Sequence, residues 1–240
     1  MHILFIKIGG SIITDKQSRL PRFNTQVTKK LLSVIFEYEK STGIKVVLGH
    51  GVGSFGHYTA LEFLREIDSL NSSQIESRLK MIHAEVRLLA NEVHSIAQSC
   101  GFEPELISPS KEKNLSDKVL AALKNGKFPI IHGDVDFDNS PHIVSTEEQF
   151  IKLLESGINP VKIILATNTD GVTDNLGNTI PLLNKNIASR TNSDATGGMY
   201  SKINFAFRML DFCKDVVIIN GKNLELELNN SKNSKTQIAK

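Results

Sequence analysis

Short apolar runs alternate with amphipathic stretches along most of the chain. The apolar runs are rich in β-branched residues, as buried strands are, and lie at residues 3–8, 45–48, 106–107, 129–131, 161–166 and 216–219. Between them, apolar residues recur every three or four positions, which predicts helices at residues 25–42, 73–96, 116–124, 146–154 and 198–210. Strands that alternate with helices predict an α/β sandwich with a mainly parallel sheet.

Local signals indicate where some elements begin and end. Gly43 is expected to end the first long helix, and Ser73 with Glu76 form a possible capping box at the start of the second. The turn residues at 174–178 predict a hairpin. From Asn229 on, the tail is polar and is expected to lie at the surface or to fray.

The length of 240 residues suggests one large domain or two closely packed lobes. No linker rich in proline, glycine or serine divides the chain. We therefore expect one continuous globular unit with an N-terminal lobe at residues 1–160 and a C-terminal lobe at residues 161–240. The seam between the lobes is expected near Asn159-Pro160.

Composition excludes some classes of protein. The formal net charge of +2 is too balanced for a protein that binds nucleic acid. Cys100 and Cys213 lie far apart and in no C-x-x-C pair, which argues against a disulfide framework or a zinc ribbon and favours reduced cysteines in the cytoplasm. No apolar run approaches the roughly 18 residues that span a bilayer, and the first residues resemble a strand more than a signal peptide. We expect no membrane partner.

Glycine clusters follow several of the predicted strands. In open α/β sheets, ligands bind beyond the carboxyl ends of the strands, and glycine lets backbone N–H groups approach a phosphate closely. A further pair, Gly197-Gly198, opens a predicted helix. The clusters at strand ends are Gly9-Gly10-Ser11, the glycines of residues 51–56, Gly133-Asp134 and Asp170-Gly171. Five such loops predict a site that handles more than one phosphate.

Two familiar nucleotide motifs fit poorly. Gly51-x-Gly53-x-x-Gly56 has the spacing of the dinucleotide fingerprint, which requires an acidic residue about 20 positions further on, at the end of the next strand. The candidate acid, Glu76, lies at a predicted helix start, and no strand precedes it. A P-loop pattern and the metalloprotease pattern H-E-x-x-H are both absent from the sequence. An NAD-binding protein is therefore disfavoured.

Three lysines accompany the glycine loops. Lys7 lies on a strand that should be buried, which is costly unless an anion meets its charge. Lys16 follows the first loop, and Lys202 lies on the first turn of the helix after Gly197-Gly198. Together they are typical of clamps on a transferring phosphoryl group. His57 ends the second glycine loop and can donate a hydrogen bond to an anion held there, whereas His50 and His132 are expected to be structural.

These residues resemble the amino acid kinase superfamily and, within it, the isopentenyl phosphate kinases. The loop that ends in His57 is the specific part, because the similar fosfomycin kinases share it and most other members lack it. The resemblance covers Met1 to about Gly221. It rests on residues 7–16, residues 50–57, Gly133-Asp134-Val135, and residues 194–199 together with Lys202.

The resemblance implies an open three-layer αβα sandwich, with the phosphate acceptor in the N-terminal lobe and ATP with Mg²⁺ in the C-terminal lobe. It implies no metal ligand from the protein itself, and a homodimer. The implied catalytic residues are Lys7, Lys16, His57 and Lys202. The implied acceptor-binding residues are Gly51, Val52, Gly53, His57, Gly133 and Asp134. The implied ATP-binding residues are Lys7, Gly9, Gly10, Ser11, Thr167, Asp170, Gly171, Gly197, Gly198 and Lys202.

Some positions depart from the family pattern. Val52 replaces a residue that is usually small, Asn168 stands where Asp is common, and Glu147 stands at about the place of an acid that orients the catalytic lysines. Three functions remain open. The first is ATP-dependent phosphorylation of isopentenyl phosphate to the diphosphate, in isoprenoid synthesis. The others are a fosfomycin kinase-like phosphonate kinase, and a nucleotide- or metabolite-binding protein with weakened catalysis.

Overall fold

The structure is a computed structural model that describes residues 1–15, 20–109, 114–137, 141–188 and 198–240. Within these residues one sheet has the strand order β3-β4-β2-β1-β7-β9-β10-β8. All neighbouring strands are parallel except β9 and β10, which confirms the mainly parallel sheet. The strands are β1 (Ile3–Ile8), β2 (Lys45–His50), β3 (Pro104–Ile107), β4 (Phe128–His132), β7 (Lys162–Thr167), β8 (Leu182–Leu183), β9 (Val216–Asn220) and β10 (Lys235–Ile238).

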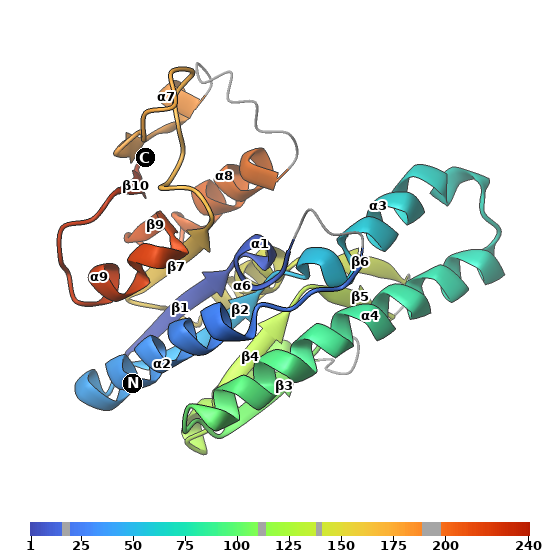
Figure 1. The fold of residues 1–240 in the computed structure, drawn as a ribbon, viewed down its shortest axis with the longest axis horizontal. Helices are drawn as coiled ribbons and strands as arrows, with labels where there is room; N and C mark the ends of the chain where they lie inside the picture. Colours follow the sequence, from blue (N-terminus) through green and yellow to red (C-terminus); the bar gives the residue numbers. More distant parts are fainter. Residues whose placement is uncertain (16–19, 110–113, 138–140, 189–197) are drawn as a thin grey trace.

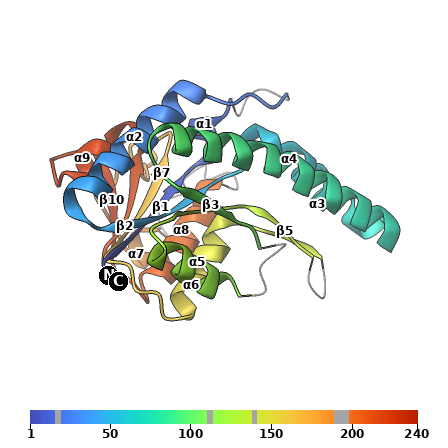
Figure 2. The same ribbon diagram turned by 90° about the horizontal axis from the view of Figure 1, so that it is seen from below.

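Helices cover both faces of the sheet, as Figure 2 shows, and this confirms the three-layer sandwich. On one face lie α1 (Gly10–Ile13), α2 (Thr25–Thr42), α4 (Ser72–Ser99) and α9 (Leu224–Leu228), and on the other lie α5 (Leu115–Lys124), α6 (Thr146–Glu155) and α8 (Gly198–Met209). The short helix α7 (Lys185–Ala188) follows β8, and three 3₁₀ turns are η1 (Gly53–Phe55), η2 (Ile67–Ser69) and η3 (Gly221–Asn223).

The alternation of side chains along β1 builds both halves of the core. Leu4 and Ile6 belong to the apolar cluster under α2 and α4, whereas Phe5 belongs to the cluster on the opposite face. There the Phe5 ring packs against Phe150 of α6, with centroids 4.8 Å apart. Strand β1 pairs with β2 on one side and with β7 on the other, so a single sheet runs through the expected lobe seam.

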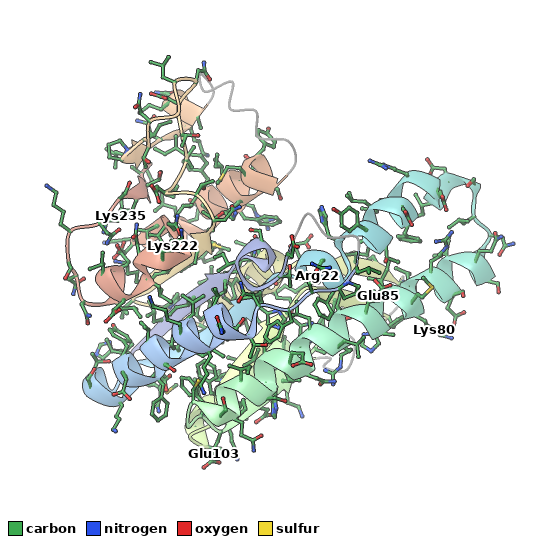
Figure 3. All side chains as sticks on the ribbon, in the orientation of Figure 1. Arg22, Lys80, Glu85, Glu103, Lys222 and Lys235 are labelled. Atoms are coloured by element: carbon green, nitrogen blue, oxygen red, sulfur yellow. The ribbon has the colours of Figure 1, made fainter. Side chains whose placement is uncertain are left out.

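Two helices and a small hairpin extend beyond the sheet. Helix α3 (His57–Glu66) and the outer half of α4 project together past the sheet edge in Figure 1, beside a small antiparallel hairpin of β5 (Asp134–Asp136) and β6 (His142–Val144). Phe63, Ile82 and Val135 contribute to a third apolar cluster that joins these elements. A side-chain hydrogen bond joins the two helices: Thr59 Oγ1 of α3 donates to Glu85 Oε2 of α4 at 2.7 Å, and Figure 3 labels Glu85.

The predicted capping box is wrong by a few residues. Helix α4 begins at Ser72, and its N-cap is Asn71, whose side chain accepts from the Gln74 N–H while the Gln74 side chain accepts from the Asn71 N–H. Both Asn71–Gln74 and Ser73–Glu76 satisfy the spacing of a capping box, so the sequence alone does not separate them. Glu76 is exposed and pairs with Lys80 one turn further along the helix.

The prediction of a frayed tail is also wrong. Strand β10 enters the sheet between β9 and β8, and Thr236 is fully buried. The Thr236 hydroxyl accepts from the Val172 N–H at 2.8 Å. Glu227, only 2% exposed, pairs with Lys162 and Lys235 and so ties the tail to β7. The predicted hairpin at 174–178 is a tight turn with one antiparallel bridge beside it.

Candidate functional site

A cavity of about 510 Å³ opens at the carboxyl ends of β1, β2, β4 and β7. The loops that follow these strands supply its polar wall, as expected for an open parallel sheet. Figure 1 shows α8 and α3 on opposite sides of α1, and the cavity lining includes Lys202 of α8 and His57 of α3. Of the predicted site residues, the cavity lining includes Lys7, Gly9, Gly10, Ser11, Gly51, Val52, Gly53, His57, Gly133, Asp134, Thr167 and Lys202.

Lys7 lies at the floor of the cavity and is 7% exposed. Its ammonium group forms an ion pair with Glu147, which lies on the first turn of α6 and is 8% exposed. Burial raises the pKa of Glu147, but the Lys7 charge and hydrogen bond outweigh it, and the net pKa lies below the usual value. Glu147 is therefore a carboxylate that fixes the direction of the Lys7 side chain.

Lys202 reaches the same end of the cavity from α8. Its Nζ lies 3.4 Å from Thr167 Oγ1 at the end of β7, and its charge also lowers the pKa of Glu147. Helix α8 begins at Gly198, so Lys202 lies one full turn inside the helix and not on its first turn as predicted. Two lysines, one on β1 and one on α8, thus flank one carboxylate, which leaves net positive charge for an anion.

Two glycine loops touch each other above Lys7. A Cβ on Gly10 would overlap the backbone of Gly53, and one on Gly53 would overlap the Thr14 hydroxyl. Gly53 also has a φ of +50°, a region that side chains disfavour. The Thr14 hydroxyl donates to Gly10 O at 2.8 Å and accepts from Ser54 N–H at 3.0 Å. Thr14 therefore links the loop after β1 to the loop after β2.

The second loop is held from outside as well. The Arg22 N–H donates to Ser54 Oγ at 3.2 Å, and Figure 3 labels Arg22 close to α1. A Cβ on Gly56 would overlap the Val86 side chain of α4, so a larger residue where α3 begins would have to displace that side chain. His57 is the first residue of α3 and lines the cavity. It lies where the helix dipole favours an anion, which fits the predicted hydrogen bond to a phosphate.

Beyond His57 the cavity becomes apolar. Its wall there is formed by side chains of α3, α4 and the β5–β6 hairpin, together with Val52. We call this region the apolar arm of the cavity; the helix and hairpin residues are Ala60, Leu61, Leu64, Ile82, Val86, Ile143 and Val144. One continuous cavity therefore joins a cationic, glycine-lined end to a hydrophobic end, with His57 between them.

The sequence matches the amino acid kinase family over residues 2–220, which is most of the chain. This protein belongs to the amino acid kinase family.

Several known proteins resemble this chain. The isopentenyl phosphate kinase of Methanocaldococcus jannaschii is 28% identical over 228 residues, which are 84% of this chain and 85% of the relative. That of Thermoplasma acidophilum is 26% identical over 239 residues, 93% and 94% of the two chains. A crystal structure of the T. acidophilum isopentenyl phosphate kinase product complex matches with a TM-score of 0.78 at 21% identity, covering 99% of this chain and all of that one. The predicted amino acid kinase-like fold is confirmed.

Asp134 lines the cavity, but its carboxylate already accepts hydrogen bonds from other residues. Oδ1 accepts from the His83 ring at 2.7 Å and from the Val135 N–H at 2.8 Å, and Oδ2 accepts from the Ser108 hydroxyl. Neither His83 nor Ser108 was predicted from the sequence to take part in the site. They lie 51 and 26 positions from Asp134, so no local pattern connects them to it.

Two of the predicted ATP-binding residues, Asp170 and Gly171, are described but are not part of the cavity lining. Asp170 accepts a hydrogen bond from Asn220 Nδ2 at 2.9 Å and is not part of the cavity lining. Gly171, with a φ of +130°, packs against Thr236 of β10, which a Cβ would crowd. Lys16 and Gly197 lie outside the described residues, and Gly198 is the first residue of α8.

Within the described ranges, no group of three or more His, Cys, Asp or Glu residues could hold a metal ion. No helix in the described part of the chain is long and apolar enough to cross a membrane.

Proposed function

We propose that this chain is an ATP-dependent kinase that converts isopentenyl phosphate to isopentenyl diphosphate. The observation that carries the proposal is the two-ended cavity, because isopentenyl phosphate has a small anionic head and a short hydrocarbon tail. The glycine loops and lysines suit the phosphates, and the apolar arm suits the tail. The isopentenyl phosphate kinases among its relatives support the same substrate.

In this proposed function, the glycine loops after β1 and β2 bind different phosphate groups. His57 and the backbone of Gly51, Val52 and Gly53 hold the acceptor phosphate, with Gly133 and Asp134 beside them. Gly9, Gly10 and Ser11 hold the transferred group between the two substrates. ATP lies on the C-terminal side, near Thr167 and Lys202, and the remaining ATP contacts predicted from the sequence are Asp170, Gly171, Gly197 and Gly198.

The reaction needs no covalent enzyme intermediate. An oxygen of the acceptor phosphate forms a bond to the γ-phosphorus of ATP, while the bond from that phosphorus to the bridging oxygen of ADP breaks and ADP leaves. The acceptor oxygen is already deprotonated near neutral pH, so no strong general base is required. Lys7, Lys16, Lys202 and the backbone N–H groups balance negative charge on the transferred group. Mg²⁺ carried on the ATP phosphates would supply further charge neutralisation.

The alternatives make different demands on the cavity. A phosphonate such as fosfomycin would need the same anion-binding loops but a small polar pocket, and the apolar arm favours an isoprenoid instead. A binding protein without catalysis is disfavoured because Lys7 and Lys202 both reach the cavity and Glu147 holds Lys7 in place. A homodimer and a cytoplasmic location remain part of the proposal on resemblance to the family alone.

The proposal is tested by ADP release with ATP and a panel of acceptors: isopentenyl phosphate, dimethylallyl phosphate, fosfomycin and inorganic phosphate. We expect turnover with the isoprenoid monophosphates. The His57→Ala variant should raise the acceptor KM or lower kcat at least tenfold while ATP binding changes little. His94→Ala, on α4 outside the cavity lining, is the matched control. Turnover of fosfomycin alone, or tight ATP binding without turnover of any acceptor, would overturn the assignment.

A further inference from the structure

Two histidines, His50 and His132, lie face to face beneath the acceptor side of the cavity. They end the adjacent strands β2 and β4 and are partners in the strand register. Their rings stack with centroids 5.5 Å apart and an interplanar angle of 21°. The residues are 1% and 0% exposed, which agrees with the expectation that they do not touch substrate.

Each ring makes the same hydrogen bond. His50 Nδ1 lies 3.2 Å from the carbonyl oxygen of Gly51, and His132 Nδ1 lies 3.0 Å from that of Gly133. Because a carbonyl oxygen can only accept, Nδ1 carries the proton in both rings. Burial, and then the neighbouring His132, lower the pKa of His50 to about 3, and burial also lowers that of His132. Both rings are therefore neutral, with Nε2 unprotonated.

The geometry of the peptide bond links these two hydrogen bonds to the orientation of the loops that follow β2 and β4. In a planar trans peptide the C=O and the following N–H point in opposite directions. A Gly51 carbonyl held toward the buried His50 ring therefore directs the Val52 N–H away from the core, and Val52 lines the cavity. His132 holds the peptide from which the β5–β6 hairpin starts, and Val144 of that hairpin belongs to the apolar arm.

We propose that His50 and His132 are a neutral positioning pair for the phosphate acceptor. His50 aims the Val52 N–H at the acceptor phosphate, and His132 sets the hairpin that closes the apolar arm. Neither ring touches substrate, so both act through the glycine that follows. The inference rests on the proposed function for the identity of the acceptor, but the orientation of the Val52 peptide stands apart from that identity.

The test compares substitutions that keep or remove the Nδ1 donor. The Asn amide nitrogen occupies about the position of Nδ1, so His50→Asn and His132→Asn keep a donor to the glycine carbonyl. His50→Leu and His132→Leu remove it. We expect each Leu variant to raise the KM for isopentenyl phosphate about tenfold, with the KM for ATP within about twofold of wild type. The Asn variants should restore most of the acceptor KM.

Failure of folding and failure of the proposed function have separate readouts. If a Leu variant does not fold, His50→Gln and His132→Gln replace it, because their amides reach toward the Nε2 position and miss the glycine carbonyl. The Val52 amide resonance, titrated with inorganic phosphate, reports the peptide orientation in wild type and in His50→Asn even if isopentenyl phosphate is not turned over. We expect a phosphate-dependent shift in both that is lost without the donor. Asn and Leu variants that behave alike, or equal effects on acceptor and ATP, overturn the inference.

Discussion

The buried pair of Lys7 and Glu147 offers a direct test of how the site is built. Both residues are less than one-tenth exposed, and Glu147 is held as a carboxylate mainly by the Lys7 charge. Glu147→Gln keeps the shape of the side chain and removes its charge. The Lys7 ammonium then stays at the cavity floor without its counter-charge, which a protein interior tolerates poorly.

The size of the effect follows from the burial of both partners. Two unit charges about 4 Å apart interact by about 4 kcal/mol at an effective dielectric constant of 20, and breaking a buried pair typically costs about 3–5 kcal/mol. Lys7 lines the cavity, so water or a bound phosphate can reach its ammonium group. We therefore expect Glu147→Gln to lower the free energy of unfolding by about 3 kcal/mol, and to lower kcat at least tenfold because Lys7 loses its fixed direction.

The assay is urea unfolding followed by circular dichroism, and it compares Glu147→Gln with a double variant that lacks both charges. Lys7→Met combined with Glu147→Leu removes both charges, and it should recover most of the stability that Glu147→Gln loses while leaving the kinase inactive. The exposed pair of Glu76 and Lys80 supplies the control, because Glu76→Gln should leave the unfolding midpoint unchanged.

Two results would refute this reasoning. If Glu147→Gln is as stable as wild type, the pair is too well solvated to act as a buried ion pair. If the double variant is less stable than Glu147→Gln alone, the two side chains stabilise the fold through packing and not through compensation of charge. Unchanged kcat in Glu147→Gln would separately remove the positioning role of Glu147.

The stability of the protein should also depend on Gly53, on strand β10 and on the protonation of His50. Gly53→Ala should impair acceptor use and should lower the free energy of unfolding by more than the roughly 1–2 kcal/mol expected from its φ of +50° alone. Gly126 is the control, because it has a φ of +73° but open space around it. Gly126→Ala should therefore lose only the roughly 1–2 kcal/mol that its backbone conformation costs, as measured by thermal unfolding. Truncation after Asn229 should lower Tm by more than 10 °C because β10 is lost, while removal of the exposed last residue should not. Folding lowers the pKa of His50 from 6.5 to about 3, so between these pH values only the unfolded chain binds a proton at His50. As the pH is lowered from about 6.5 to about 3, the free energy of unfolding should therefore decrease by up to about 1.4 kcal/mol per pH unit in acid-urea titrations. His50→Asn should lose this component of the pH dependence.

The sequence predicted those features that short-range patterns encode. Buried strands are runs of β-branched residues, and the glycines that follow them are visible without any knowledge of pairing, so the loops after β1, β2 and β4 were located correctly. The β5–β6 hairpin has strands of only three residues and leaves almost no periodic signal. Strand β10 was missed because its stability comes from distant partners, chiefly Val172 and the neighbouring strands β8 and β9, and not from its own polar sequence.

The alignment of the two halves of the site depends on a single strand. Register places Lys7 beside Gly49 of β2 and Leu165 of β7, and Ile8 beside His50 and Ala166. A slip of β1 by one residue would turn the Lys7 side chain to the other face of the sheet, into an apolar cluster where no carboxylate meets it. The buried Lys7–Glu147 pair therefore penalises wrong registers, and the correct register sets the loop after β1 against the loop after β2. In-line transfer between two substrates requires that fixed alignment, and here it follows from strand pairing before any ligand binds.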